Sequence, residues 1–531
     1  MKERPYQKLI EKNKKIIVFL FFLVLLLTGL NIYKDYGVHW DEYTNQHFGY
    51  KWAGYANNVI FRKGVAGDSS PDSQDLTHGP VFEIFVLFIQ RKFFSINDSR
   101  HLIFFRHLCT FLLFYTGVYF FYLICKLHFK NWKICLLGSV FFILSPRIFA
   151  ESFYNSNDIP FLSFYIICMY TLLRYLDKKT FTSAAIHAVT CALLIDIRIA
   201  GVTLPLYTLA FLAADILRMS THREKVRGSK TALLYISLLI VLSFIFWPLL
   251  WSHTFSKLAM MVKALKNDYW TGSYLYFGRY AKLENQPWHY GPVWILISTP
   301  LFYSFCFFVG CLASIKMYIK NSIMPACTKR NNLLFALWFL FPLILSYRRM
   351  YDGWRHLYFI YPAFLIFSLT GLIALWKFIE IRFQKQISRI IHAALIIAAV
   401  LSMTNSVYFM VKNHPYQNVY FNILAGRNMK AIKSRFELDY WGLSYRKALE
   451  YILRNDKDDV IKIYVANAPG RHNANILTED CKKRLLYVTS LDDAKYFLSN
   501  YRFHPGEYPY KEEFFSIKIG EAKIMIVYKL K

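Results

Sequence analysis

The sequence predicts a polytopic membrane protein of the mainly α class, in which a bundle of about eleven transmembrane helices precedes a small α/β domain outside the membrane. The chain has 531 residues, of which 55% are hydrophobic and 19% aromatic, and its mean hydropathy is +0.26. A single soluble domain of this composition would expose large apolar areas to water. Apolar runs of the roughly 17 to 25 residues that cross a bilayer recur as far as residue 411 and then stop.

The first apolar segment, residues 16–33, follows a basic start and lacks the small-residue cleavage site of a signal peptide. We therefore expect it to be retained as a transmembrane helix. The expected crossings lie near residues 16–33, 103–125, 134–150, 159–175, 182–197, 200–217, 231–250, 292–315, 333–346, 357–376 and 390–411.

The run from Val81 to Ile89 decides the topology, because it is too short to span comfortably and is followed at once by Arg91 and Lys92. If it lies as a helix in the outer interface, the basic loops all fall on the cytoplasmic side with the basic N-terminus. These loops contain Lys126, Lys130 and Lys133; Arg174, Lys178 and Lys179; Arg218 to Lys230; Lys316 to Arg330; and Lys377 to Arg389. The C-terminal domain then faces the periplasm or exterior of a bacterial inner membrane.

The net charge of +30, from 64 Lys and Arg against 34 Asp and Glu, resides largely in these short loops. That pattern is typical of membrane topology and argues against nucleic acid as a partner. Of the nine cysteines only Cys481 lies outside the apolar region, and no CxxC pattern is present. The sequence therefore predicts neither a disulfide framework nor a zinc-binding motif.

The same topology gathers polar residues on the outer side. They are Asp41 and Glu42 in His39-Trp40-Asp41-Glu42, His78, Asp158, Asp196, Arg198, His253, Arg279, Glu284, His289, Arg348, Arg349, Asp352, Arg355 and His356. Arginine and aspartate at membrane depth are costly, so such a group indicates a functional site. Arginine suits a phosphate and a carboxylate suits removal of a hydroxyl proton, so the group favours chemistry on a phosphate-bearing lipid.

Each of these residues also has a structural interpretation. Asp41 and Asp158 could cap helices, a role compatible with catalysis. Arg198 could pair with Asp196, and Arg348 and Arg349 could anchor the chain at lipid headgroups. His253 and His289 are either aromatic-belt residues or metal ligands, so a divalent metal stays an open alternative and no cofactor is assigned.

Four motifs together resemble the GT-C membrane glycosyltransferases, in particular the group that contains protein O-mannosyltransferases and lipid A aminoarabinose transferases. They are Asp41-Glu42 after the first crossing, His78-Gly79-Pro80, Arg106 early in the next crossing, and Asn155-Ser156-Asn157-Asp158-Ile159-Pro160. Weaker similarities are Arg198, the aromatic run Trp288-His289-Tyr290, and Glu437 to Gly442. The aminoarabinose transferases have Glu-Lys-Pro where this chain has His78-Gly79-Pro80, and the mannosyltransferases have His and Pro there.

The resemblance implies transfer of a sugar, with inversion, from a polyprenyl-phosphate donor to a protein, lipid A or polysaccharide acceptor at the outer membrane face. It makes Asp41 the general base, with Glu42 supporting it or orienting the acceptor. Arg106, Arg198, Arg349 and Arg355 are the candidates that hold the donor phosphate, and Asp158 would orient the acceptor, hold an arginine or help bind a metal. The candidates for substrate binding are His78, Trp288, His289 and Tyr290.

The last part of the sequence, residues 413–531, is expected to form a separate domain. The membrane domain before it would comprise residues 1–412, with a first outer loop at residues 34–102. Ser444 to Arg454 has helical spacing, Val460 to Val465 alternates like a strand, and residues 514–528 indicate a hairpin. The competing class is a transporter or lipid flippase, which would place charge pairs near the bilayer midplane. A third class is a non-catalytic envelope scaffold.

Overall fold

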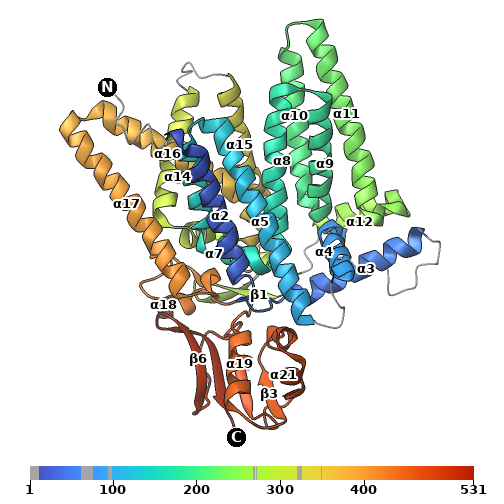
Figure 1. The fold of residues 1–531 in the computed structure, drawn as a ribbon, viewed down its shortest axis with the longest axis vertical. Coiled ribbons are helices and arrows are strands. Elements are labelled where there is room, and N and C mark those ends of the chain that lie inside the picture. The colour runs from blue at the N-terminus through green and yellow to red at the C-terminus, as the bar shows by residue number, and fades with distance from the viewer. Residues whose placement is uncertain are drawn as a thin grey trace.

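A computed structural model describes residues 11–60, 76–93, 99–266, 270, 272–319, 326–347 and 350–531. Figure 1 shows long helices running side by side through most of the molecule and a compact C-terminal domain at one end of them. The fold class is therefore that expected: a polytopic helical bundle followed by a small α/β domain.

Eight helical segments in the described part of the chain are long and apolar enough to cross a membrane. They are α2 (Lys14–Ile32), α5 (Ser99–Phe129), α8 (Asp158–Lys178), Ile199–Arg218 including α10 (Thr203–Arg218), α11 (His222–Phe246), α14 (Leu301–Ile319), Arg355–Arg382 including α16 (Tyr361–Arg382), and α17 (Lys385–Lys412). A ninth would be the pair α6 (Trp132–Ile143) and α7 (Pro146–Tyr154), bent by 69°. Proline at the start of α7 explains the break, because its ring cannot continue the preceding helix.

Within the described residues, the structure has fewer spans than the expected eleven because two expected crossings are not among them. Helix α9 (Phe181–Ile197) has only 17 residues, and α15 (Ala326–Leu345), which contains Pro342, is not among the helices that are long and apolar enough. The expected crossing at 292–315 is present, but it is divided into α13 (Tyr290–Ser298) and the span α14. Hydrophobic runs predict where apolar helix occurs, but breaks within a run depend on the local backbone.

Helices α14 and α16 approach closely because each has a glycine at the contact. A Cβ on Gly310 would lie 1.9 Å from the Phe367 carbonyl oxygen, and one on Gly371 would lie 1.9 Å from that of Cys306. Small residues allow this kind of helix approach within membranes, where packing rather than the hydrophobic effect holds helices together.

Three helices that are not among the spans lie at the level where the bundle meets the C-terminal domain (Figure 1). They are α3 (Glu42–Ile60), α4 (Val81–Phe93) and α12 (Thr254–Lys266). Helix α4 covers the run expected to lie in the outer interface, and it has 13 residues, too few to span. The same end contains η4 (Pro248–Trp251), η5 (Leu283–Asn285) and the hairpin of β1 (Ser273–Tyr276) and β2 (Arg279–Lys282).

The chain after α17 first packs against the bundle and then forms the α/β domain. Buried residues between Tyr416 and Leu443 belong to the same hydrophobic core as the transmembrane helices. This segment contains η7 (Gln417–Val419) and α18 (Met429–Lys433). It attaches the domain to the membrane part.

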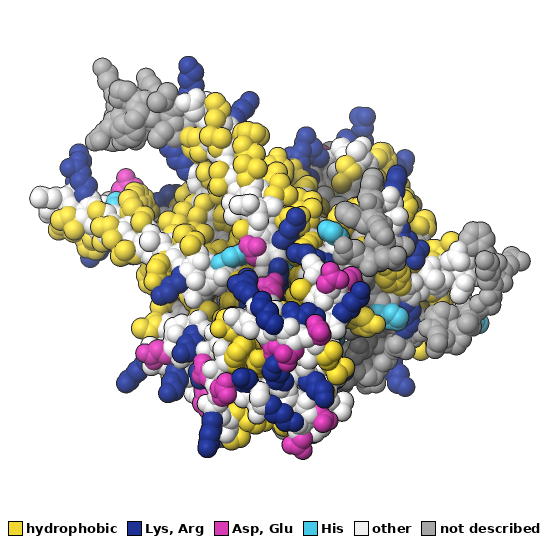
Figure 2. All heavy atoms as spheres, turned by 60° about the horizontal axis from the view of Figure 1, so that its bottom comes forward, with side chains coloured by type: hydrophobic (Ala, Val, Ile, Leu, Met, Phe, Trp, Pro, Cys, Tyr) yellow, Lys and Arg dark blue, Asp and Glu magenta, His cyan; other side chains and the backbone are white. Residues whose placement is uncertain are grey.

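The α/β domain has a five-stranded sheet in the order β4-β3-β5-β7-β6, with its own core. Strand β3 pairs in parallel with β4 and β5, and β7 pairs antiparallel with β5 and β6. Its elements are α19 (Tyr445–Asn455), β3 (Ile461–Val465), α20 (Pro469–His472), η8 (Asn473–Ile476), α21 (Glu479–Lys483), β4 (Leu485–Tyr487), β5 (Tyr496–Ser499), β6 (Glu513–Ile519) and β7 (Ala522–Lys529). The expected helix, strand and closing hairpin of the tail are present. Figure 2 shows charged side chains of both signs over this end of the molecule.

Candidate functional site

Asp158 is the centre of an arginine–carboxylate cluster at the junction of the bundle and the C-terminal domain. Its carboxylate Oδ1 lies 2.9 Å from Nη1 of Arg198, and Oδ2 lies 3.1 Å from Nη1 of Arg355. The Asp158 side chain is only 1% exposed. Three residues that are far apart in the sequence therefore meet in one buried contact, as their shared outer position predicted.

Asp158 is placed by the turn between α7 and α8. Asn155 accepts the backbone N–H of Asp158 at 2.9 Å and donates its own amide to the Asp158 carboxylate at 3.0 Å. Asparagine is suited to such local side-chain to backbone bonds. Pro160 then lies in the first turn of α8, where the missing N–H costs nothing.

Asp41 lies at the accessible edge of this cluster. Its carboxylate is 3.7 Å from Nη2 of Arg355, and its side chain is 30% exposed. The Asp41 carbonyl accepts the backbone N–H of Asn45 at 2.9 Å, so Asp41 also precedes the first turn of α3. Asp41 therefore lies at the start of a helix and beside an arginine at the same time, so the two expected roles are compatible.

Glu42 lies in a second, fully buried network. Its carboxylate is 2.5 Å from Nε of Arg106 and 2.8 Å from Nε2 of His39. Burial by itself would raise the pKa of Glu42, but the Arg106 guanidinium and the His39 hydrogen bond outweigh it and hold that pKa well below its usual range. Glu42 is therefore ionised and paired.

Arg106 joins Glu42 to a further carboxylate that the sequence analysis did not single out. Its Nη1 and Nη2 donate to the two oxygens of Glu83 at 2.7 and 3.0 Å, and its side chain is 3% exposed. Burial raises the pKa of Glu83 in spite of Arg106. The guanidinium was expected to be available to a donor phosphate, whereas here two carboxylates occupy it.

Arg198 and His78 form the other side of the Asp158 cluster. Arg198 donates from Nε to Nε2 of His78 at 3.2 Å, and its side chain is 14% exposed. His78 is held because Gly79 docks on Asp196: a Cβ on Gly79 would lie 2.3 Å from the Asp196 carbonyl oxygen. The Asp196 carboxylate accepts the N–H of Val81 at 2.7 Å, so it holds the start of α4.

Arg355 is enclosed by aromatic rings and by residues of the C-terminal part. Its guanidinium carbon lies 4.7 Å from the ring centre of Trp441 and 5.0 Å from that of Tyr351. Asp352 lies 3.6 Å away and is also 2.8 Å from Arg502, which follows β5. Trp441 belongs to the Glu437 to Gly442 segment, which the sequence already indicated. Arg502 has no local motif, because only folding brings it to the site.

The aromatic run at residues 288–290 has separate surroundings. Trp288 is 75% exposed, and Nδ1 of His289 lies 2.7 Å from the Tyr276 hydroxyl. Tyr290 is buried, and its hydroxyl accepts the N–H of Gly353 at 3.2 Å. Arg349 lies outside the described residues.

The expected histidines do not form a metal-like group within the described ranges. His253 is exposed, with a left-handed backbone. Among the His, Cys, Asp and Glu side chains of the described residues, one group of three has ligand atoms close enough together to hold a metal ion. It consists of Cys168, His187 and Cys191 within the bundle. Both ring nitrogens of His187 lie 2.8 Å from threonine hydroxyls, so this group is a hydrogen-bonded core cluster.

These observations define a polytopic membrane protein whose buried arginine–carboxylate site lies between its helical bundle and its α/β domain. No family model and no curated protein matches the sequence. Along nearly its whole length the chain is similar to two crystal structures of ArnT from Cupriavidus metallidurans. The apo structure has 8% identity and a TM-score of 0.47 over 97% of this chain and 98% of that one. The structure bound to undecaprenyl phosphate has 9% identity and a TM-score of 0.45 over 96% and 97%.

Proposed function

We propose that this protein is a membrane glycosyltransferase that transfers a sugar, with inversion, from a polyprenyl-phosphate-linked donor to an acceptor hydroxyl at the outer face of the membrane. One observation carries the proposal: the partly exposed carboxylate of Asp41 lies 3.7 Å from Arg355, and Arg355 shares Asp158 with Arg198. A reachable carboxylate and two cations thus lie close together, an arrangement that suits displacement of a phosphate by a hydroxyl.

Asp41 is assigned the general base because it is the carboxylate that an acceptor can reach. Its side chain is 30% exposed, whereas those of Glu42 and Asp158 are 2% and 1% exposed. The two buried carboxylates already hold arginines, so they position the site rather than accept a proton. Asp41 would take the hydroxyl proton while the acceptor oxygen attacks the anomeric carbon.

Arg198 and Arg355 are assigned to the donor phosphate. A departing phosphate is already a weak base, so it needs charge stabilisation more than a proton. Arg355 has a buried Nε with no hydrogen-bond partner among the described residues, and a buried donor of this kind favours a ligand that accepts from it. His78 would orient Arg198 through their 3.2 Å hydrogen bond.

The positions of these residues favour the transferase over a transporter or flippase. Asp158 begins α8, Arg198 directly follows α9 and Arg355 begins the segment before α16. Charges at helix ends suit chemistry at a membrane surface, whereas a transport site needs them near the midplane. We place this surface, with the C-terminal domain, on the periplasmic or outer side of a bacterial inner membrane. A neutral hexose such as mannose is the proposed sugar, because His78-Gly79-Pro80 follows the mannosyltransferase pattern.

The test uses the full-length protein in lipid nanodiscs with a panel of undecaprenyl-phosphate-linked sugars. Protein, lipid A and polysaccharide fractions from the envelope serve as acceptors. Asp41→Asn is expected to abolish transfer while binding of undecaprenyl phosphate remains. Asp35→Asn is the control, because Asp35 is exposed and pairs only with His414 among the described residues. Wild-type turnover in Asp41→Asn would remove the base assignment, and absence of both transfer and lipid-phosphate binding in the wild type would overturn the function.

A further inference from the structure

Asp352 lies between an arginine of the membrane part and an arginine of the C-terminal domain. Its Oδ2 is 3.6 Å from Nη2 of Arg355, and its Oδ1 is 2.8 Å from Nη2 of Arg502. The three side chains are 4 to 6% exposed. A carboxylate that is shared in this way fixes the distance between the two guanidinium groups.

Arg502 also contacts the segments that carry the two other key groups of the site. Its guanidinium carbon lies 4.8 Å from the ring centre of Trp40, the residue directly before Asp41. Its Nη1 donates to the carbonyl oxygen of Tyr440 at 2.5 Å, and the next residue, Trp441, covers Arg355. One side chain thus bridges the chain beside the candidate base and the chain beside the candidate phosphate ligand.

The backbone around this contact adopts costly conformations. Asp352, Tyr501 and Phe503 have φ values of 55°, 61° and 62°, in the left-handed region that favours glycine. Two of these residues flank Arg502 and the third is its partner. Such strain persists where the surrounding structure imposes it, and it is concentrated at functional sites.

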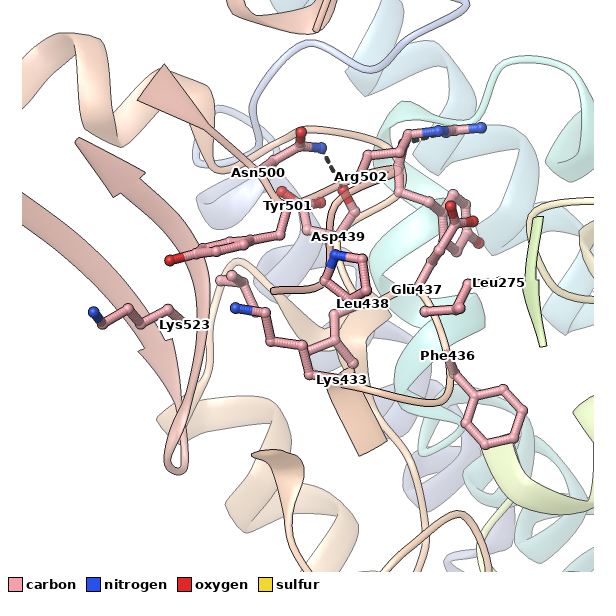
Figure 3. A pocket seen from close by; sticks show the side chains of 13 residues that line it. Leu275, Lys433, Phe436, Glu437, Leu438, Asp439, Asn500, Tyr501, Arg502 and Lys523 are labelled. Carbon is pink, nitrogen blue, oxygen red and sulfur yellow. Dashed lines mark hydrogen bonds between the residues drawn. The ribbon is translucent and has the colours of Figure 1, made fainter. Parts of the chain in front are cut away.

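Arg502 does not itself have room to bind a substrate. The pocket that it lines with Glu437 and Asp439 has a volume of about 10 Å³, enough for about one water molecule. Figure 3 shows the Arg502 side chain extending away from Lys433 and Lys523, with the hydrogen bond from Asn500 to the Asp439 carbonyl beside it. The geometry therefore indicates a role that acts through neighbouring residues.

We propose that the C-terminal domain completes the site, and that Arg502 is a positioning residue for Arg355 and Asp41. This inference rests on the proposed function. While Arg502 holds Asp352, the Arg355 guanidinium stays against Asp158 and near Asp41. Without Arg502 the buried Asp352 carboxylate loses its nearest partner and draws Arg355 toward itself. The cation then lies away from the departing phosphate.

The test compares Arg502→Gln, Asp352→Asn and the double variant in nanodiscs. We expect Arg502→Gln to lower kcat by about tenfold to a hundredfold, since misplacement of a catalytic group by about 1 Å has effects of this size. The KM for the donor should rise less than kcat falls. The double variant should be more active than Arg502→Gln, because removing the unpaired carboxylate releases Arg355. Arg454→Gln, an exposed site in the same domain, is the control and should match the wild type.

A merely structural contact predicts a different result: the double variant would regain stability, because no buried charge is left unpaired, but kcat per folded molecule would be the same in Arg502→Gln, the double variant and the wild type. Equal or lower activity of the double variant would overturn the proposal. A cryo-electron microscopy structure of Arg502→Gln gives a readout that does not need activity: Arg355 should have moved from Asp158 toward Asp352, and an unmoved Arg355 would contradict the inference. If the wild type transfers no sugar, the proposed function fails while this structural comparison still decides the positioning role.

Discussion

Asp41 and Glu42 are consecutive in the chain, but their carboxylates have opposite surroundings. The side chain of Asp41 is 30% exposed and lies 3.7 Å from Arg355, whereas that of Glu42 is 2% exposed and lies 2.5 Å from Arg106. The difference arises because α3 begins at Glu42, so the two side chains leave the backbone in different directions. The acidic pair is thus divided into an accessible group and a buried one.

Glu42→Gln is expected to destabilise the protein, whereas Asp41→Asn should not. Removing one partner of a buried ion pair costs about 3–5 kcal/mol, because the other charge is left unpaired. Glu42 pairs with Arg106 and His39, and Asp41 makes one longer, partly solvated contact. Thermal unfolding of the purified proteins in detergent should show a lower Tm for Glu42→Gln alone. Equal Tm values for the two variants would contradict this division.

Arg198→Gln and Arg106→Gln should affect donor binding differently. We expect Arg198→Gln to weaken binding of undecaprenyl phosphate by about tenfold or more, as a charge-assisted hydrogen bond contributes about 1.5–3 kcal/mol. Arg106 is already occupied by Glu42 and Glu83, so its loss should lower Tm and leave affinity of the folded protein unchanged. Titration in nanodiscs measures both affinities. A larger loss of affinity in Arg106→Gln would reverse the assignment.

Gly79→Ala should disturb the site through His78. The added Cβ would lie 2.3 Å from the Asp196 carbonyl oxygen and 2.6 Å from its carboxylate, and overpacking of this kind costs about 1–3 kcal/mol. We expect a lower Tm together with reduced transfer. Gly54→Ala is the matched control, since its Cβ would meet nothing within 4 Å and alanine favours helix. If Gly79→Ala keeps wild-type Tm and activity, the close approach is not needed.

Glu437 should make stability depend on pH near neutrality. Burial raises the pKa of Glu437 to about 7, although Arg502 opposes the shift. The folded protein therefore retains this proton at pH values where the unfolded chain has lost it, and the free energy of unfolding falls as pH rises from about 4.5 to about 7. Tm should be higher at about pH 6 than at about pH 8, and Glu437→Gln should reduce this difference. An unchanged difference would show that other groups cause it.

Part of the candidate site was predictable because its residues carry a local or positional signal. Asp41, Asp158, Arg198 and Arg355 were grouped by topology, and the structure brings them together. Asp352 was placed on the outer side, but its link to Arg502 was not predicted. Arg502 and Glu83 have no motif around them. Arg502 meets a partner 150 residues away, and Glu83 meets Arg106 on another helix, so neither contact leaves a local pattern.

Arg106 shows the limit of assigning roles by residue type. An arginine beside a membrane site suggests a phosphate ligand, but the structure surrounds it with Glu42 and Glu83. Charge and position along the chain do not reveal which carboxylate folds against which guanidinium. That choice follows from how α3, α4 and α5 pack.

By itself, the sequence determined the class of the protein, its apolar helices, the α/β fold of its tail and the grouping of its charged residues at one end of the helices. These properties depend on composition and on hydrophobic runs, which any segment displays without its neighbours. Only the tertiary structure decided which acid is buried, which arginines share Asp158 and that the C-terminal domain reaches Arg355. Those outcomes depend on contacts between distant segments, and such contacts exist only after the helices and the domain have packed together.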